Sequence, residues 1–378
     1  MQKRAANMEL LRILAMIFIV SVHYVSANSV VTTYLDANEF IARIINSCTY
    51  CCVNIFVLIS GWFYKPSREI TISKPVEKAT FLWLKTIFYS ITIMLIYSAA
   101  TKSFPSKNTL IESFIPITCK AYWFLSAYIV LLFVSPFLDR LINNISCREH
   151  GLAVILIVAL VSIPSTFLPE KWLIDIQEGY SVLWFVCLYI IGSFLKRISD
   201  RIKISKHMLL IGYFIAVASF MAFFFTVKYL CLKIGTDDRS IRVFRYTSLP
   251  SLVSAVCLLL FFAKVNIKSD KATKFICAIS SVTFDVYIIH GYELMGINLY
   301  SNLLNGKEYV SSPYMILHFV ACVAIIYTGC TVVGLIRAKI LDKPFKAVAH
   351  FAGEKAGLLE NKILGKRREV FSPPRKSD

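Results

Sequence analysis

The sequence predicts an all-α membrane protein with about ten transmembrane helices and both termini in the cytoplasm. Hydrophobic residues make up 57% of its 378 residues, charged residues make up only 17%, and the mean hydropathy is +0.64. A soluble protein carries about a quarter charged residues. The apolar residues also gather into runs that can cross a hydrocarbon layer of roughly 30 Å as helices. Helices are expected because the backbone must satisfy its own hydrogen bonds in lipid.

The ten expected helices are apolar runs separated by more polar segments, and the fifth and sixth are the least pronounced. In chain order they cover Glu9–Val30, Ile41–Tyr64, Ala79–Ala100, Ala121–Leu141, His150–Leu168, Gly179–Leu195, His207–Leu232, Ser248–Asn266, Phe275–Ile297 and Tyr314–Leu341. This organisation divides the chain into a membrane domain, 1–342, and a basic cytoplasmic tail, 343–378. We expect the first run to be retained in the protein, since it reaches membrane length without a small-residue cleavage site.

The Lys and Arg residues predict the orientation. The net charge is +18, and these cations lie mostly in the tail and in loops on the side of the N-terminus. Short cytoplasmic loops are enriched in Lys and Arg, so both termini are expected in the cytoplasm. The tail is expected to rest on anionic lipid headgroups. One basic loop falls on the opposite side, and it contains Lys233, Arg239, Arg242 and Arg245.

The same distribution of charge argues against two other classes of protein. The cations lie between apolar runs, which is a membrane pattern, so no nucleic-acid partner is expected. Most of the eleven Cys residues lie within or at the edges of apolar runs, where a thiol behaves as a small hydrophobe. Cys48 and Cys51 have CxxC spacing, but no second pair accompanies them, and we expect no metal.

The first helix carries two residues that could perform chemistry. Arg12 and His23 are eleven residues apart, so they project from nearly the same helix face, separated by roughly 16 Å along the axis. Ionisable groups within a membrane are costly and mark candidate functional sites. The alternative interpretation is that Arg12 anchors the helix at the surface and His23 is a core residue with its hydrogen bonds satisfied.

The spacing of these residues resembles the start of the acyltransferase 3 family of membrane acyltransferases. The first helix of that family carries an Arg and a His separated by ten residues. The segment from Asn7 through Arg12 to His23 resembles this pattern. Further similar segments follow in the family's order up to Leu341: Phe56–Phe63, Tyr122–Leu125, Ser135–Leu138, Arg245–Ser248 and Phe284–His290. The chain lacks the Arg pair that many members carry after the second helix, and offers Arg68, Lys74, Lys78 and Lys85 there.

The resemblance implies an O-acyltransferase of the bacterial inner membrane. Its donor would be cytoplasmic acetyl-CoA, and its acceptor a hydroxyl of a surface polysaccharide or a lipid-linked sugar. The basic cytoplasmic face matches the phosphates of such a donor. Arg12 would bind or orient the donor, and His23 would either accept the hydroxyl proton or carry the acyl group.

The resemblance also gives four candidate substrate-binding residues. His290 and Tyr287 lie in the expected ninth helix, and His290 could line the same cavity as His23. Arg245 could meet an anionic acceptor or anchor a helix end. Trp123 could bind substrate or be one of the aromatic residues that are common at membrane interfaces.

Three alternative functions remain open from the sequence. A transporter or translocase of a glycan or lipid-linked sugar would also have many helices with charges inside the membrane. A non-catalytic membrane scaffold would agree with the missing Arg pair. Within the family, the acyl group could differ from acetyl or the acceptor could differ from a glycan.

Overall fold

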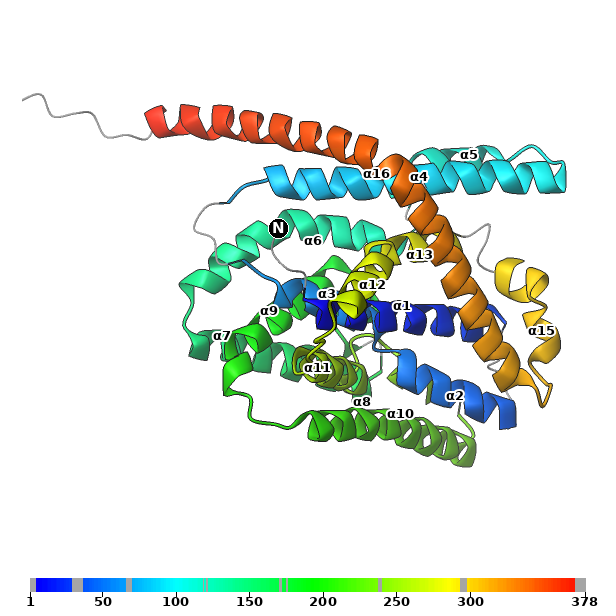
Figure 1. Ribbon diagram of the computed structural model, residues 1–378. Coiled ribbons are helices and arrows are strands. Elements are labelled where there is room, and N and C mark those ends of the chain that lie inside the picture. Colours follow the sequence, from blue (N-terminus) through cyan, green and yellow to red (C-terminus); the bar gives the residue numbers. More distant parts are fainter. Residues whose placement is uncertain are drawn as a thin grey trace, which may run out of the picture.

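The computed structural model describes residues 5–28, 37–65, 70–117, 119, 122–169, 172–174, 176–236, 240–292 and 298–370, and these form helices and loops without a strand. Many helices lie along one direction and form a bundle (Figure 1). Within the described residues, nine helices are long and apolar enough to cross a membrane. The prediction of an all-α, multi-pass membrane protein is therefore confirmed.

The α-helices of the described residues follow here in chain order. They are α1 (Ala6–Ala27), α2 (Ala37–Thr49), α3 (Cys52–Trp62), α4 (Ser73–Thr101), α5 (Lys107–Phe114), α6 (Trp123–Asn144), α7 (Cys147–Ile157), α8 (Ile163–Phe167), α9 (Val182–Ile198), α10 (Lys206–Ile234), α11 (Leu249–Ala263), α12 (Asp270–Ser281), α13 (Thr283–His290), α15 (Gly306–Tyr309) and α16 (Met315–Val370).

Three of the expected spans contain an interruption that the hydropathy pattern does not reveal. The second span breaks between α2 and α3, and the ninth breaks at Val282 between α12 and α13. In the fifth span a π-helical segment, Val158–Ser162, joins α7 to α8. The expected eighth span is the short apolar helix α11, which has 15 residues. Hydropathy is averaged over a window of residues, so it shows where a span lies. It does not show a helix break or a π-helical segment within that span.

The last helix is longer than the sequence predicted. Its expected end was Leu341, but α16 continues past Pro344 to Val370 and its later part lies along α4 (Figure 1). A Cβ atom on Gly353 would lie 2.9 Å from the Ser73 carbonyl oxygen, so glycine permits this close approach. Packing against α4 thus makes much of the basic tail helical.

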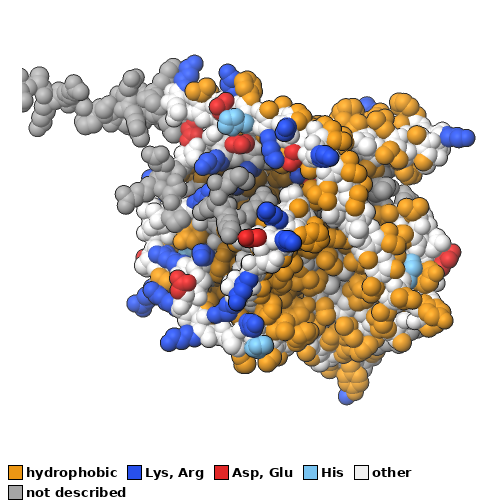
Figure 2. Space-filling model, viewed as in Figure 1, with side chains coloured by type: hydrophobic (Ala, Val, Ile, Leu, Met, Phe, Trp, Pro, Cys, Tyr) orange, Lys and Arg blue, Asp and Glu red, His pale blue; other side chains and the backbone are white. Residues whose placement is uncertain are grey.

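The charged side chains are unevenly distributed over the surface. In Figure 2 most of the visible Lys and Arg side chains lie toward the end where α1 and α4 begin, and hydrophobic side chains cover most of the remaining surface. A hydrophobic surface of this kind suits contact with lipid tails. Arg12 lies toward the charged end of α1, and His23 lies toward the opposite end.

The centre of the bundle depends on close contact between α3 and α9. A Cβ atom on Gly192 would lie 2.3 Å from the Leu58 carbonyl oxygen, and one on Gly61 would lie 2.2 Å from the Tyr189 carbonyl oxygen. This agrees with the role of small residues in bringing membrane helices together. Asn54 adds polar contacts, because its side chain donates to the Tyr246 carbonyl at 2.8 Å and accepts from the Trp184 indole at 3.0 Å.

We expect Gly192→Ala to lower the free energy of unfolding by roughly 1–3 kcal/mol, because the added methyl group forces α3 and α9 apart. Unfolding of the purified protein by SDS in mixed micelles measures this change. Gly329→Ala is the matched control, since nothing lies within 4 Å of a Cβ atom there. Equal effects of the two substitutions would contradict the role assigned to this contact.

Candidate active site

The structure brings two histidines together from helices distant in sequence. His23 of α1 and His290, the last residue of α13, have ring centroids 5.0 Å apart. His290 is fully buried, and its Nδ1 lies 2.5 Å from the Val286 carbonyl oxygen. A carbonyl oxygen only accepts hydrogen bonds, so Nδ1 carries the hydrogen and donates it. Nε2 of His290 is then a proton acceptor, and it has no hydrogen-bond partner among the described residues.

Aromatic residues surround this histidine pair and hold the end of α13. The Tyr287 ring lies edge-on to the His290 ring at 6.4 Å, and the Phe124 ring of α6 lies 5.7 Å from the Tyr287 ring. The buried Tyr122 hydroxyl donates to the Ile288 carbonyl at 3.1 Å. Tyr287 therefore lies beside the histidine pair, and the start of α6 contacts this end of α13.

Arg12 lies away from the histidines, on the side of the bundle where α1 begins. Its guanidinium group pairs with Glu9 at 2.5 Å, and its side chain remains 30% exposed. Glu9 also accepts a hydrogen bond from Ser280 of α12, so the carboxylate is held between two helices. The structure thus places Arg12 in a partly open, polar setting rather than in direct contact with His23.

A buried ionic cluster centres on Asp285, which lies five residues before His290 on α13. Asp285 is fully buried, and its carboxylate contacts Lys85 of α4 at 2.9 Å and Arg337 of α16 at 2.6 Å. The Tyr89 hydroxyl also donates to it at 2.9 Å. Arg337 pairs in addition with Asp342. The carboxylate is therefore neutralised and hydrogen-bonded, as a buried charge must be.

The comparison with known protein families decides the class of protein. A family model described as an acyltransferase domain, Acyl_transf_3, matches residues 6–335. The chain belongs to the acyltransferase 3 family. No curated protein and no solved structure matches the chain. The molecule is thus a multi-pass membrane acyltransferase.

Two other predicted site residues of the acyltransferase lie in a second group. Trp123 begins α6 and contacts the rings of Tyr180 and Tyr246 at 4.5 and 5.9 Å. Arg245 precedes α11, is buried, and pairs through Nε with Glu178 at 2.8 Å. Tyr122, the residue before Trp123, donates to the Ile288 carbonyl near the end of α13, so this group lies on the side of the bundle where α13 ends.

The cations that follow the expected second helix have different surroundings. Lys85 is buried within α4 and paired with Asp285, so it is not available to a donor phosphate. Lys74 and Lys78 are exposed on the first two turns of α4. Arg68 and Arg239 lie outside the described residues. Lys85, Asp285 and Arg337 each lie inside a different apolar run, which the sequence shows. Only the structure shows that they pair with one another.

Another histidine of the acyltransferase, His318, has a structural explanation. Its Nε2 donates to the Leu304 carbonyl and its Nδ1 accepts from the Tyr24 hydroxyl, each at 2.8 Å. It also stacks on Tyr309 with ring centroids 4.0 Å apart. Among the described residues, no group of three or more His, Cys, Asp or Glu side chains is arranged to hold a metal ion.

We expect Asp285→Asn to destabilise the acyltransferase by about 3–5 kcal/mol, because Lys85 and Arg337 would keep buried charges without their common partner. SDS titration in mixed micelles measures the free energy of unfolding. Glu354→Gln is the control: its carboxylate is 62% exposed, and a change below about 0.5 kcal/mol is expected. A loss for Asp285→Asn no larger than that of the control would contradict an essential ionic cluster.

Proposed function

We propose that this acyltransferase transfers an acyl group, acetyl in the first instance, from a cytoplasmic coenzyme A thioester to a hydroxyl of a surface polysaccharide or lipid-linked sugar. The membership of the family supports acyl transfer. The observation that carries the site assignment is the contact between His23 and His290, two imidazoles that are 267 positions apart in the sequence. The proposed location is the inner membrane of a bacterium, with both termini in the cytoplasm.

His23 acts as the general base in the proposed reaction. Its imidazole accepts the proton of the acceptor hydroxyl while that oxygen forms a bond to the acyl carbonyl carbon. The carbon–sulfur bond then breaks, and the electron pair leaves with the sulfur of coenzyme A. The imidazolium returns its proton to this thiolate, so the products are an ester and the free thiol. Imidazole suits both steps because its unperturbed pKa lies near neutral pH.

His290 orients His23 and contributes a second proton acceptor. Its Nδ1–H is held by the Val286 carbonyl, so the ring cannot rotate without losing that bond. This leaves Nε2 unprotonated beside the His23 ring. The buried position of His290 fixes its ring further, and such preorganisation costs no rearrangement during the reaction.

Arg12 binds the donor near the charged end of the bundle. The roughly 16 Å between Arg12 and His23 along α1 suits a donor whose phosphates and thioester lie at opposite ends of an extended arm. The exposed Lys74 and Lys78 lie at the start of α4 and add positive charge for the phosphates. In this arrangement the phosphates stay at the cytoplasmic surface while the acyl group approaches the histidines.

We expect His23→Ala and His290→Ala each to lower acetyl transfer by about 10²- to 10⁴-fold, which is the usual contribution of general acid–base catalysis. Inverted membrane vesicles with labelled acetyl-CoA and the host's own glycan fraction measure base-labile label in the glycan. His207→Ala is the control, because His207 is exposed at the start of α10 and full transfer should persist. Undiminished transfer by His23→Ala, with normal membrane insertion, would overturn the assignment.

Arg12→Gln should raise the KM for acetyl-CoA by about tenfold and change kcat much less, since one charge-assisted contact to a phosphate is lost. Initial rates against acetyl-CoA concentration measure both constants. Lys362→Gln, on the part of α16 beyond the family match, is the control and should leave the KM unchanged. A fall in kcat alone would contradict a role in donor binding.

A further inference from the structure

A cluster of three aromatic rings lies at the side of the bundle where the histidines are found. Trp123, Tyr180 and Tyr246 contact one another with ring centroids 4.5, 5.1 and 5.9 Å apart. Trp123 is the first residue of α6, Tyr180 lies just before α9, and Tyr246 lies just before α11. Tyr246 is buried, whereas Tyr180 is 40% exposed. Tyr180 is therefore the most exposed residue of the cluster, and Trp123 and the buried Tyr246 pack against its ring.

The backbone beside this cluster adopts an unusual conformation. Gln177, Glu178 and Gly179 have φ angles of 49°, 55° and 103°, so three consecutive residues lie in the left-handed region. Two of them are not glycine, and such residues persist only where the surrounding structure holds them. The Tyr246 amide donates to the Glu178 carbonyl at 3.1 Å, and a Cβ atom on Gly179 would lie 2.6 Å from the Tyr246 Cβ. This strained turn fixes Glu178 beside the rings.

Arg245 and Glu178 neutralise each other. Arg245 pairs with Glu178 through Nε and donates to the Ser165 carbonyl at 3.3 Å. Arg245 is buried, but the Glu178 side chain is 41% exposed, so its carboxylate can accept hydrogen bonds from a ligand as well. The pair carries no net charge. An uncharged ligand with hydroxyl groups therefore suits this region better than the anionic acceptor considered for Arg245 from the sequence.

A continuous series of rings joins this cluster to the histidine pair. Trp123 contacts Phe124 at 5.9 Å, Phe124 contacts Tyr287 at 5.7 Å, and Tyr287 contacts His290 at 6.4 Å between centroids. The Phe124 and Tyr287 rings are buried, so a ligand held at Tyr180 would lie at one end of a packed series of rings whose other end contacts His290.

We propose that Tyr180, Trp123 and Glu178 form a binding subsite for an uncharged sugar ring of the acceptor, an inference that rests on the proposed function. The C–H face of the sugar packs on the Tyr180 ring, which Trp123 supports, and the sugar hydroxyls donate to the Glu178 carboxylate. Aromatic surface with a few placed polar groups is the usual composition of a small-molecule site. Arg245 holds Glu178 in place and does not itself contact the sugar.

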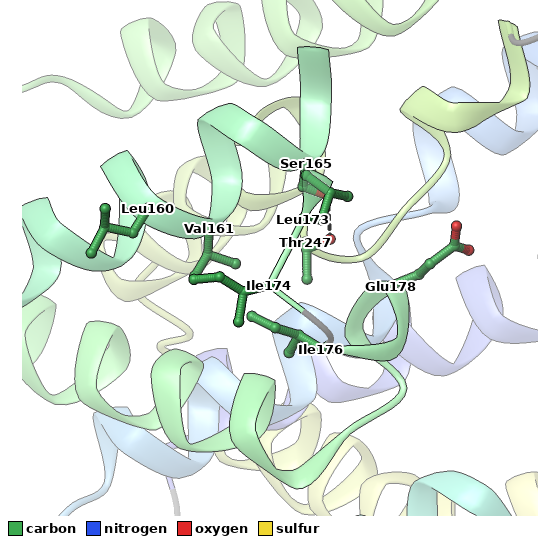
Figure 3. A pocket seen from close by; sticks show the side chains of 8 residues that line it. All are labelled: Leu160, Val161, Ser165, Leu173, Ile174, Ile176, Glu178 and Thr247. Atoms are coloured by element: carbon green, nitrogen blue, oxygen red, sulfur yellow. Dashed lines mark hydrogen bonds between the residues drawn. The ribbon is translucent and has the colours of Figure 1, made fainter. Parts of the chain in front are cut away.

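A small hollow next to Glu178 is not the sugar site itself. It encloses about 20 Å³, which is room for roughly one water molecule. Figure 3 shows its aliphatic side chains, including Leu160 and Ile174, on the side away from the Glu178 carboxylate. The sugar ring accordingly packs on the exposed aromatic surface and not within this hollow.

Saturation-transfer NMR tests the subsite without any acyl transfer. The probes are the methyl glycosides of glucose, N-acetylglucosamine and rhamnose, with methyl glucuronide as the anionic comparison, and the protein is kept in a detergent without a sugar headgroup. At least one uncharged glycoside should show saturation transfer, strongest at the ring C–H protons. Tyr180→Ala should weaken binding by about fivefold or more, and Glu178→Gln should weaken it by at least about threefold.

Two exposed residues provide matched controls for these substitutions. Tyr229→Ala and Glu308→Gln change the same residue types on α10 and α15, and binding should stay unchanged. Absence of binding by every uncharged glycoside, preference for the glucuronide, or equal binding by Tyr180→Ala and the intact protein would each overturn the subsite. Sugar binding without any acetyl transfer in vesicles would instead contradict the proposed function and leave the subsite standing.

Discussion

A carboxylate inside a membrane protein must be neutralised, and the position of α13 depends on how Asp285 meets this requirement. Lys85 of α4 and Arg337 of α16 both pair with it, and Tyr89 donates a third contact. Removing one member of such a group leaves an uncompensated charge, so the three helices stay together. His290 lies five residues further along α13 and takes its position beside His23 from this arrangement. The ionic cluster around Asp285 thereby helps to position the histidine pair without contacting it.

The two sides of the bundle have different chemical character, and this difference organises the proposed reaction. Arg12 and the exposed lysines at the start of α4 lie where Lys and Arg side chains gather. The histidines lie toward the other side, next to aromatic rings and the balanced pair of Arg245 and Glu178. A phosphate-bearing donor and an uncharged acceptor would therefore approach the same reacting groups from opposite sides of the membrane domain.

Small residues set how closely the helices can approach, and they act at two distant places. Gly61 and Gly192 allow α3 and α9 to meet at the centre of the bundle, and Gly353 allows the end of α16 to lie along α4. The second contact lies beyond the residues that match the family. The hydropathy pattern ended the last helix at Leu341, because close helix packing at a glycine does not change an average of hydrophobicity.

The sequence by itself determined the fold class, the approximate spans and the family, because apolar runs of membrane length and an ordered set of motifs are local properties of the chain. It also identified His23, Arg12, His290 and Tyr287 as candidates. The tertiary structure alone decided that His23 faces His290, that Lys85 and Arg337 share Asp285, and that Glu178 neutralises Arg245. Each of these contacts joins residues far apart in sequence. Which of these residues meet depends on how the helices pack against one another. The periodicity of a single segment carries no information about that packing.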